Sequence, residues 1–253
     1  GGVIHPPCIN RSDHVNTIYG KHIYLGLGQL RGLERLVIQR ILNERQIHGK
    51  FRDFDDFIDR VPIAIEQLTI LVRIDAFRGF GVPKKQVLWQ AVFKSKTHKR
   101  DTVQKLLFKP HHRHFSLPHL PSHPVEDAYD QLELLGFPLC GYYELMDGAV
   151  KSQVMVKDFE AHVNQKIWIY GSMVHTRLNT TSKGDTMRFT TMLDLEGNFF
   201  DCVHFPQSMH STSIHGKGIY LCHGRVTEEF GHYSLEVVTI IKQPLKPDPR
   251  QVG

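Results

Sequence analysis

The sequence has few cysteines and no long apolar run. Its four cysteines, Cys8, Cys140, Cys202 and Cys222, are scattered through 253 residues with no short spacing between any two. This pattern excludes a disulfide framework and a zinc site built on paired cysteines, and it favours reduced, mostly buried thiols. No stretch approaches the roughly eighteen apolar residues of a membrane span, and the N-terminus lacks the residue order of a signal peptide. We therefore expect a cytoplasmic protein with no membrane partner.

Sequence motifs for catalysis are missing as well. There is no glycine-rich Walker loop and no nucleophile elbow. Two metal ions for phosphoryl transfer need a pair or trio of strand-borne acids, whereas only Asp194 and Asp201 lie in strand-like segments and no third acid joins them. A histidine cluster is broken by prolines and has no neighbouring cysteine or carboxylate, so it is interpreted as solvated linker: His111, His112, His114, His119 and His123. We expect a binding fragment with no metal, cofactor or catalytic residue of its own.

The first 95 residues predict an all-α domain. Apolar residues recur at helical spacing, and helices are expected over 32–45, 54–61, 62–77 and 84–93. Asp53 fits the N-cap of the second helix. Pro62 and Pro83 fit the first positions of the third and fourth.

The remainder of the chain changes character twice. Residues 96–124 are rich in proline and histidine without an apolar period, which predicts a linker. A helical connector is expected over 125–158, a β-domain over 159–243 and a tail over 244–253. Five strand-like segments, with a short helix between the third and fourth, favour an oligonucleotide/oligosaccharide-binding (OB) barrel: 166–176, 187–194, 199–205, 218–229 and 232–242. The expected fold class is multidomain α+β.

Two glycine turns in the helical half are the first candidate site. In a helix-hairpin-helix unit, a Gly-apolar-Gly turn lets the backbone approach a phosphate, and the second helix points its N–H groups at it. Gly79-Phe80-Gly81 followed by Lys84 and Lys85 fits this form. Gly32-Leu33-Glu34 fits it less well because an acid replaces the second glycine. For each turn the alternative is an ordinary connection between packed helices.

Charge supports DNA contact by this half. Residues 1–95 hold 14 Lys or Arg against 9 Asp or Glu, which accounts for the whole net charge of +5. A basic surface suits the phosphate backbone of DNA. The predicted duplex contacts are Arg31, Gly32, Arg35, Gly79, Gly81, Lys84 and Lys85.

The β-domain is the second candidate site, because OB barrels bind single strands across strands two and three and through neighbouring loops. Its basic residues Arg177, Lys183 and Arg188 are predicted to meet phosphates.

Strand alternation decides which aromatic residues of 199–205 face outward. Phe199, Val203 and Phe205 share the more apolar face and are predicted to form the core. That leaves Phe200 and His204 exposed as base-stacking groups. For each aromatic residue, filling the core is the alternative.

The third candidate is the pentapeptide from Gln104 to Phe108 in the linker. Gln-x-x-Leu-Phe is the form of a peptide that docks into a sliding clamp, with the glutamine at one edge and Leu107 and Phe108 in an apolar pocket. The alternative is a short helix packed back on the protein.

Taken in order, these segments resemble the C-terminal region of the bacterial DNA polymerase III alpha subunit. Within the predicted barrel, Lys183-Gly184, Met187, Phe189, Asp194, Gly197 and Phe205-Pro206 look like the family's first three OB strands. Upstream, five stretches match family segments in the right order: HPPCINRSD, IYLGLGQLRGL, GKFRDFDDFIDRV, LTILVRIDAFRGFG and ELLGFPLCGYYEL. The ordered series covers nearly the whole chain.

The resemblance implies a function in DNA replication. It implies a tandem helix-hairpin-helix domain on the duplex product, an OB domain on the single-stranded template and a clamp-binding peptide at Gln104 to Phe108. The implied partners are primer-template DNA, the beta sliding clamp and other polymerase III holoenzyme subunits. The parent would be a DNA-directed DNA polymerase, a nucleotidyltransferase, whose catalytic aspartates and Mg²⁺ lie in a palm domain absent from this chain.

Three departures and two alternatives accompany this resemblance. Glu34 replaces a hairpin glycine, Asp75 stands where the family tends to have glycine, and Tyr142-Tyr143 replaces a His-Pro pair. One alternative is the same region of an error-prone relative, although the Lys183-Gly184 loop and the clamp peptide look more like the replicative branch. The other is a free-standing single-strand DNA-binding accessory protein.

Overall fold

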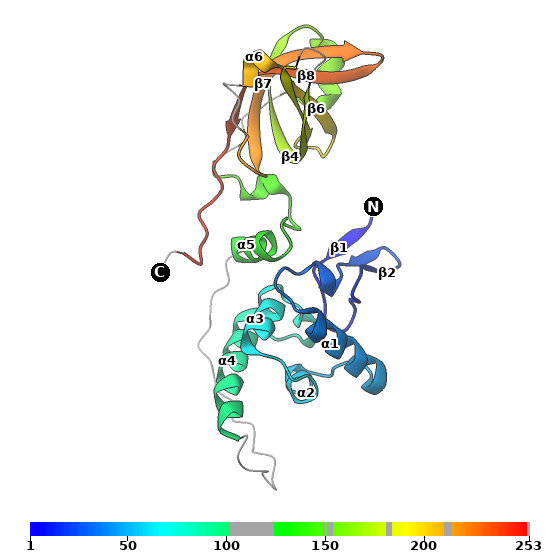
Figure 1. The fold of residues 1–253 in the computed structure, drawn as a ribbon, viewed down its shortest axis with the longest axis vertical. Helices are drawn as coiled ribbons and strands as arrows, with labels where there is room; N and C mark the ends of the chain where they lie inside the picture. Colours follow the sequence, from blue (N-terminus) through cyan, green and yellow to red (C-terminus); the bar gives the residue numbers. More distant parts are fainter. Residues whose placement is uncertain (102–123, 149, 151–153, 181–183, 210–213, 252–253) are drawn as a thin grey trace. The chain divides into compact units, whose positions relative to one another are not determined.

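The chain divides into two units, each with its own core. Gly1–Leu139 with Asp248–Gly253 form the first unit and Cys140–Pro247 form the second (Figure 1). The computed structural model describes residues 1–101, 124–148, 150, 154–180, 184–209 and 214–251, with only the backbone course for 94–101 and 124. The segment 125–158, expected as one connector, is shared between the units. Among the described residues, no helix is long and apolar enough to cross a bilayer.

The first unit combines a small sheet with helices. In chain order its elements are β1 (Val3–His5), β2 (Thr17–Tyr19), β3 (His22–Tyr24), η1 (Leu27–Gln29), α1 (Arg35–His48), α2 (Phe54–Arg60), α3 (Ile65–Arg73), η2 (Arg78–Phe80), α4 (Lys84–Asp101) and α5 (Pro124–Leu134). The sheet order is β1-β3-β2, with β1 parallel and β2 antiparallel to β3. The sequence did not predict these strands, because three residues are too few for an alternating pattern to develop.

The four predicted helices of the first unit are present with shifted ends. Asp53 caps α2 as expected, its Oδ1 accepting a hydrogen bond from the Asp56 N–H at 2.8 Å. Pro62 lies outside α3, and its carbonyl accepts a hydrogen bond from Arg40 instead. The fourth helix, α4, continues to Asp101, so the start of the expected linker is helical.

Phenylalanines organise the core of the first unit. Phe57 is fully buried and meets Phe51 and Phe77 edge to face, with ring centroids 5.1 and 5.0 Å apart. Phe54 meets Phe77 in the same way at 5.1 Å. Such a cluster joins α2 to the segments on either side of it, and truncating Phe57 to alanine would cost about 3–5 kcal/mol. This core fixes where the two glycine turns lie.

The second unit is a closed barrel of five strands. Its elements are η3 (Tyr142–Leu145), η4 (Val156–His162), β4 (Lys166–Thr180), β5 (Thr186–Leu193), β6 (Phe199–His204), α6 (Pro206–Met209), β7 (Ile219–Glu229) and β8 (His232–Lys242). The order around the barrel is β4-β5-β6-β8-β7, with β7 returning to β4 and β6 running parallel to β8. All five predicted strands and the short helix are confirmed, and with them the OB-fold.

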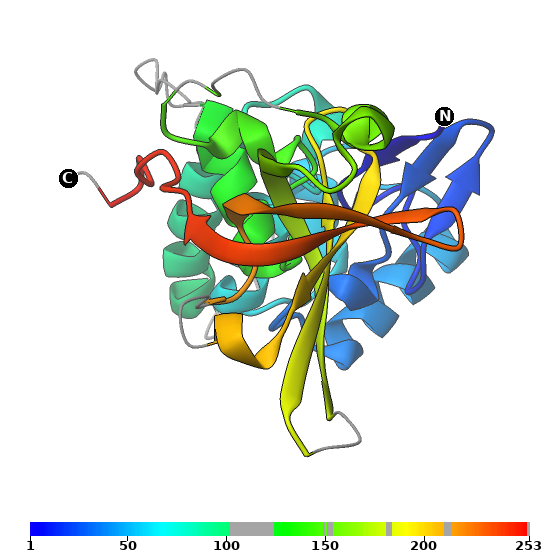
Figure 2. The same ribbon diagram turned by 90° about the horizontal axis from the view of Figure 1, so that it is seen from above.

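The β4–β5 hairpin is longer than the barrel wall. Figure 2 shows the outer halves of β4 and β5 running together as a two-stranded ribbon away from the remaining strands. On β4 the side chains from Val174 to Thr180 are all exposed. The ribbon therefore presents side chains to solvent on both faces.

The predicted orientation of β6 is wrong. Phe200 and His204 are 2% and 0% exposed, whereas Phe199 is 64% and Phe205 38% exposed. The inner face is set by the partners of β6, since Phe200 lies opposite the buried Met192 and meets the ring of Phe159 from η4 at 5.9 Å. The more apolar side of the strand is thus the outer one.

Candidate nucleic-acid interface

The first glycine turn is held by a neutral side chain. Gly32 has φ +79°, a conformation that a side chain would strain. The Gln67 amide on α3 donates to the Gly32 carbonyl at 2.9 Å and accepts from the Glu34 N–H at 2.8 Å. Glu34 is the N-cap of α1 and provides no side-chain cap of its own. Gln67 therefore fixes both sides of the turn without charge.

Two arginines of the first turn are open to solvent. The guanidinium of Arg31 lies against Gly136, and the Arg31 backbone N–H donates to the Leu134 carbonyl at 2.8 Å. Arg35 is the first residue of α1, and its side chain forms no hydrogen bond or ion pair with any described residue. Both are exposed. The structure thus leaves two unneutralised cations beside the N-terminus of a 14-residue helix.

The second glycine turn has an open backbone. Gly81 adopts the left-handed conformation with φ +69°, and no atom lies within 4 Å of the Cβ positions of Gly79 or Gly81. Lys84 begins the long helix α4 directly after the turn. The geometry allows a phosphate to approach the backbone, as the motif predicts.

The lysines that follow the second turn contact carboxylates of α5. Lys84 Nζ lies 2.5 Å from Asp127 Oδ1 and 2.7 Å from Asp130 Oδ2. Lys85 Nζ lies 2.9 Å from Glu126 Oε1. Burial alone would lower the pKa of Lys84, but the two carboxylates raise it above its usual value. The cations predicted to meet phosphate are therefore already paired with acids.

Asp130 is the centre of this ion-pair network. Its side chain is only 5% exposed, and it accepts from Arg73 Nε at 2.8 Å, Lys84 Nζ at 2.7 Å and Arg250 Nη1 at 2.6 Å. Arg73 and Arg250 also contact Glu133. The network fastens α3, α4, α5 and the segment after Asp248 to one another, which is a structural role.

Asp75 has a backbone conformation that favours glycine. It has φ +60°, a region that favours glycine and tolerates aspartate. Its carbonyl accepts a hydrogen bond from Arg78 Nη1 at 2.9 Å, and its burial raises the pKa of its carboxyl group. A glycine is the unstrained residue for this position.

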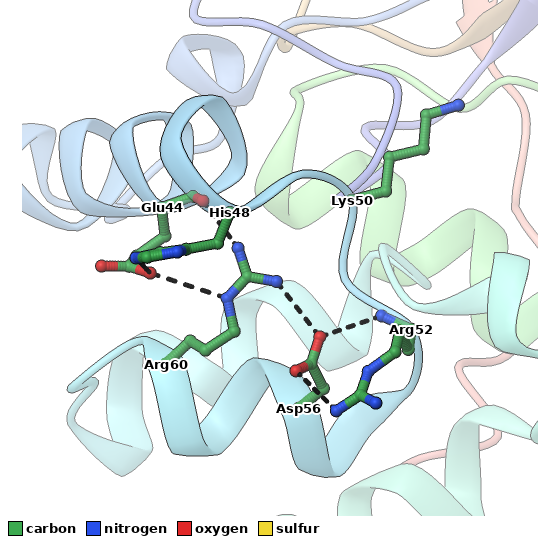
Figure 3. A pocket seen from close by; sticks show the side chains of 6 residues that line it. All are labelled: Glu44, His48, Lys50, Arg52, Asp56 and Arg60. Carbon is green, nitrogen blue, oxygen red and sulfur yellow. Dashed lines mark hydrogen bonds and ion pairs between the residues drawn. The ribbon is translucent and has the colours of Figure 1, made fainter.

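A polar pocket between α1 and α2 contains further cations (Figure 3). Arg60 lies over the Phe51 ring at 4.3 Å and donates to the Glu44 carbonyl at 2.6 Å. Its Nη1 pairs with Asp56 at 3.1 Å, and Asp56 also accepts from the Arg52 N–H. Glu44 and Asp56 both pair with Arg60, so these ion pairs fasten the end of α1 to α2.

The barrel carries a basic and aromatic strip on the outer face of β4, β5 and β6. Arg177 lies over the Phe189 ring at 5.4 Å. Phe189 is opposite Val203 of β6, so the three side chains share one face. The exposed Phe199 lies at the other end of β6 on the same face. Because sequence reasoning reversed β6, it assigned the exposed Phe199 to the core.

The inner face holds the two residues that were predicted to be outside, and Arg188 with them. His204 pairs with Arg188 across β6 and β5, so both side chains lie on the barrel side. Burial, with a smaller contribution from Arg188, lowers the pKa of His204 to about 4. The His204 ring is therefore neutral at pH 7, and neither it nor Phe200 can stack on a base at the surface. Lys183 and the pentapeptide Gln104 to Phe108 lie outside the described residues.

Known proteins resemble both parts of the chain. Residues 1–87 match the helix-hairpin-helix motif family. The DNA polymerase III subunit alpha of Staphylococcus epidermidis is 26% identical over 245 residues, covering 87% of this chain and 21% of the relative. The error-prone DNA polymerase of Mycobacterium bovis is 31% identical over 93 residues, covering 36% of this chain and 8% of the relative. The chain thus spans about a fifth of the length of this alpha subunit.

A solved structure resembles part of the chain. The second OB-fold domain of replication protein A from Methanococcus maripaludis matches with a TM-score of 0.25 and 13% identity, covering 32% of this chain and 85% of that domain. The strand order establishes the fold of the second unit independently. The resemblance predicted from the motifs is confirmed: the first unit carries the helix-hairpin-helix motif, and the chain is similar over most of its length to DNA polymerase III alpha subunits.

Proposed function

We propose that the chain is the DNA-binding C-terminal part of a replicative DNA polymerase III alpha subunit, acting in the cytoplasm. The observation that carries this proposal is the extent of the similarity, because 87% of the chain must include much of both units. The error-prone polymerase of Mycobacterium bovis and the alpha subunit of Staphylococcus aureus match similar shares of the chain, 36% and 35%, so the choice of the replicative branch rests on the longer match. On this proposal, nucleotidyl transfer with Mg²⁺ belongs to other parts of the parent polypeptide. Among the described residues, no group of three or more His, Cys, Asp or Glu is placed to hold a metal ion.

The first unit would contact the backbone of the duplex product. At the first turn, Arg31 and Arg35 are exposed cations next to a helix N-terminus. At the second turn, Gly79 and Gly81 leave the backbone open to a phosphate. Contacts of this kind read no base edge, which suits an enzyme that must hold every sequence it copies.

The second unit would bind the single-stranded template across the outer face of β5 and β6. Arg177 supplies positive charge there, and Phe189 and Phe199 supply rings for stacking. Lys183, between β4 and β5 in the sequence, would add a phosphate contact. This combination of aromatic rings and cations binds single strands with little sequence preference.

Binding of primer-template DNA by the full chain tests the DNA proposal. Fluorescence anisotropy with a labelled primer-template should show binding at 50 mM salt. The affinity should fall steeply as the salt concentration rises. Each duplex phosphate contact should contribute roughly −0.9 to the slope of log K against log salt. A variant carrying Arg177→Ala and Phe199→Ala should lose affinity for the single-stranded arm alone. Absence of binding at 50 mM salt would refute the proposal.

The clamp contact needs its own experiment. We propose that Gln104, Leu107 and Phe108 dock into the beta sliding clamp, which would raise processivity through effective concentration. Replacing the three residues by alanine should abolish capture of the chain by immobilised clamp and leave primer-template affinity unchanged. Capture that survives the triple substitution would show that another segment binds the clamp.

A further inference from the structure

Lys166 and Arg225 stand side by side on the barrel, on β4 and β7. They are direct partners in the β4–β7 ladder, and both side chains are exposed. Like charges directly opposite each other on neighbouring strands destabilise a sheet. Neither cation forms a hydrogen bond or an ion pair with another described residue. Within the fold, only Arg225 of the two has an acid among its ladder partners, Glu236 on β8.

A shallow groove surrounds the two cations. Its walls are contributed by the start of β4, the middle of β7 and β8, the residue after β6, and α6. Its lining residues are Lys166, Phe205, Gln207, Ser208, Arg225, Glu236, Val237 and Val238. Phe205 is 38% and Val238 43% exposed, which provides an apolar surface beside the charges. Glu236, opposite Arg225 in the β7–β8 ladder, is the one acid among these lining residues. The groove therefore keeps a net positive charge.

An aromatic platform continues the groove along the same two strands. Trp168 and His223 are the next outward-facing pair of the β4–β7 ladder. Their rings are stacked, with centroids 4.4 Å apart and planes inclined by 21°. Trp168 remains 39% exposed. A large ring held rigid by a stacked neighbour, and still open to solvent, is a surface on which a nucleobase can stack.

We propose that this groove on β4 and β7 is a second binding site for single-stranded nucleic acid, in which Lys166 and Arg225 bind phosphates and Trp168 stacks on a base. The two cations and the exposed indole together favour a nucleotide chain as the occupant of this groove. An acidic peptide would satisfy the cations without using the exposed indole, whereas a nucleotide chain carries an anion and a flat ring at neighbouring positions. The inference rests on the proposed function only in that the barrel binds single strands.

The test uses the full chain with Trp89→Phe, which leaves Trp168 as the sole tryptophan. Titration with oligo(dT) is followed by tryptophan fluorescence, which reports this groove, and by anisotropy of labelled oligo(dT), which reports total binding. We expect quenching of Trp168. A Lys166→Ala, Arg225→Ala variant should weaken the quenching titration roughly tenfold or more at 0.1 M salt and reduce its salt slope by about 1.4, because two single-strand phosphate contacts are lost.

A matched control separates local contacts from net charge. Lys21→Ala with Lys217→Ala removes two exposed cations elsewhere and should have a much smaller effect on the quenching titration. The groove variant should melt close to the temperature of the parent, because removing the like-charge pair and removing Arg225 from opposite Glu236 act in opposite directions.

Two outcomes would overturn the inference, and they can be told apart. If anisotropy shows binding but Trp168 is not quenched, or if the groove variant loses no more than the control, the groove is not a binding site and the proposed function stands. If the anisotropy of neither labelled oligo(dT) nor labelled primer-template rises when the chain is added, the proposed function fails and this site with it.

Discussion

The two glycine turns of the first unit differ in whether the neighbouring cations are paired with acids. At the first, a neutral amide from Gln67 holds the turn, and Arg31 and Arg35 remain exposed. At the second, the glycines are open, but Lys84 and Lys85 are bound by carboxylates of α5. The turn with the better sequence motif therefore has the less available cations.

The difference shows that a local count of charges does not measure available charge. Residues 1–95 carry a net charge of +5, but the acids that neutralise Lys84 and Lys85 come from α5, beyond Asp101. A helix distant in sequence thus converts a predicted phosphate contact into a structural ion pair. Substitutions at either turn can therefore remove this difference or make it larger.

Breaking the network at the second turn should have the largest effect. We expect Asp130→Asn to lower the free energy of unfolding by about 3 kcal/mol, because it leaves three cations without their shared buried partner. Urea denaturation of the full chain measures this. The neighbouring Asp127→Asn, whose side chain is 61% exposed, should cost less than about 1 kcal/mol. Equal losses for the two variants would contradict the central role of Asp130.

The next largest effect concerns the affinity for duplex DNA, which should fall more when the cations of the first turn are removed than when those of the second are removed. Replacing Arg31 and Arg35 by alanine should weaken binding of duplex DNA roughly tenfold or more at 0.1 M salt, because exposed cations release counterions when they bind phosphates. Replacing Lys84 and Lys85 by alanine should weaken it less, since these lysines are bound to α5. The sequence alone predicts the reverse order, because Glu34 interrupts the first motif. Anisotropy with blunt duplex DNA decides between the two orders, with urea denaturation as the check that each variant is folded.

Much of this architecture can be predicted from the sequence where the signal is local. Helix caps, turn glycines and alternating strands are short-range patterns, and they located Asp53 at the start of α2 and all five barrel strands. Short strands such as β1 carry no such pattern. The ion pairs of Lys84 depend on an acid dozens of positions away, which no local pattern reveals.

The reversal of β6 has a different physical cause. Alternation separates Phe199 from Phe200 but does not say which side is inside. The barrel decides by what each residue meets, and Phe200 meets Met192 and the Phe159 ring from η4. Sequence hydrophobicity favoured the face with Phe199 and Phe205, which is the outer one. An exposed apolar face on a small barrel is itself a sign of a binding surface.

Removing the Gln67 side chain, which holds the first turn, should lower stability modestly. Gln67→Ala deprives the Gly32 carbonyl and the Glu34 N–H of their shared partner. Because water can reach these exposed groups, we expect a loss of about 1 kcal/mol in the free energy of unfolding. Gln39→Ala, at an exposed position on α1, is the matched control and should change stability by less than about 0.5 kcal/mol. A Gln67 variant as stable as the Gln39 variant would mean that the amide does not hold the turn.

The smallest predicted effect concerns the strained residue before the second turn. Asp75 has φ +60° and a carboxyl pKa raised by burial. A raised folded pKa means that stability is highest below the unfolded pKa of about 3.8 and falls as pH rises through the folded value. Asp75→Asn removes the charge and keeps a residue that tolerates this backbone, so its gain should be absent at pH 3 and present at pH 7. Asp75→Gly should add about 0.5 kcal/mol of backbone relief at both pH values. If urea denaturation shows the same gain for Asp75→Asn at both pH values, the charge is not what destabilises this position.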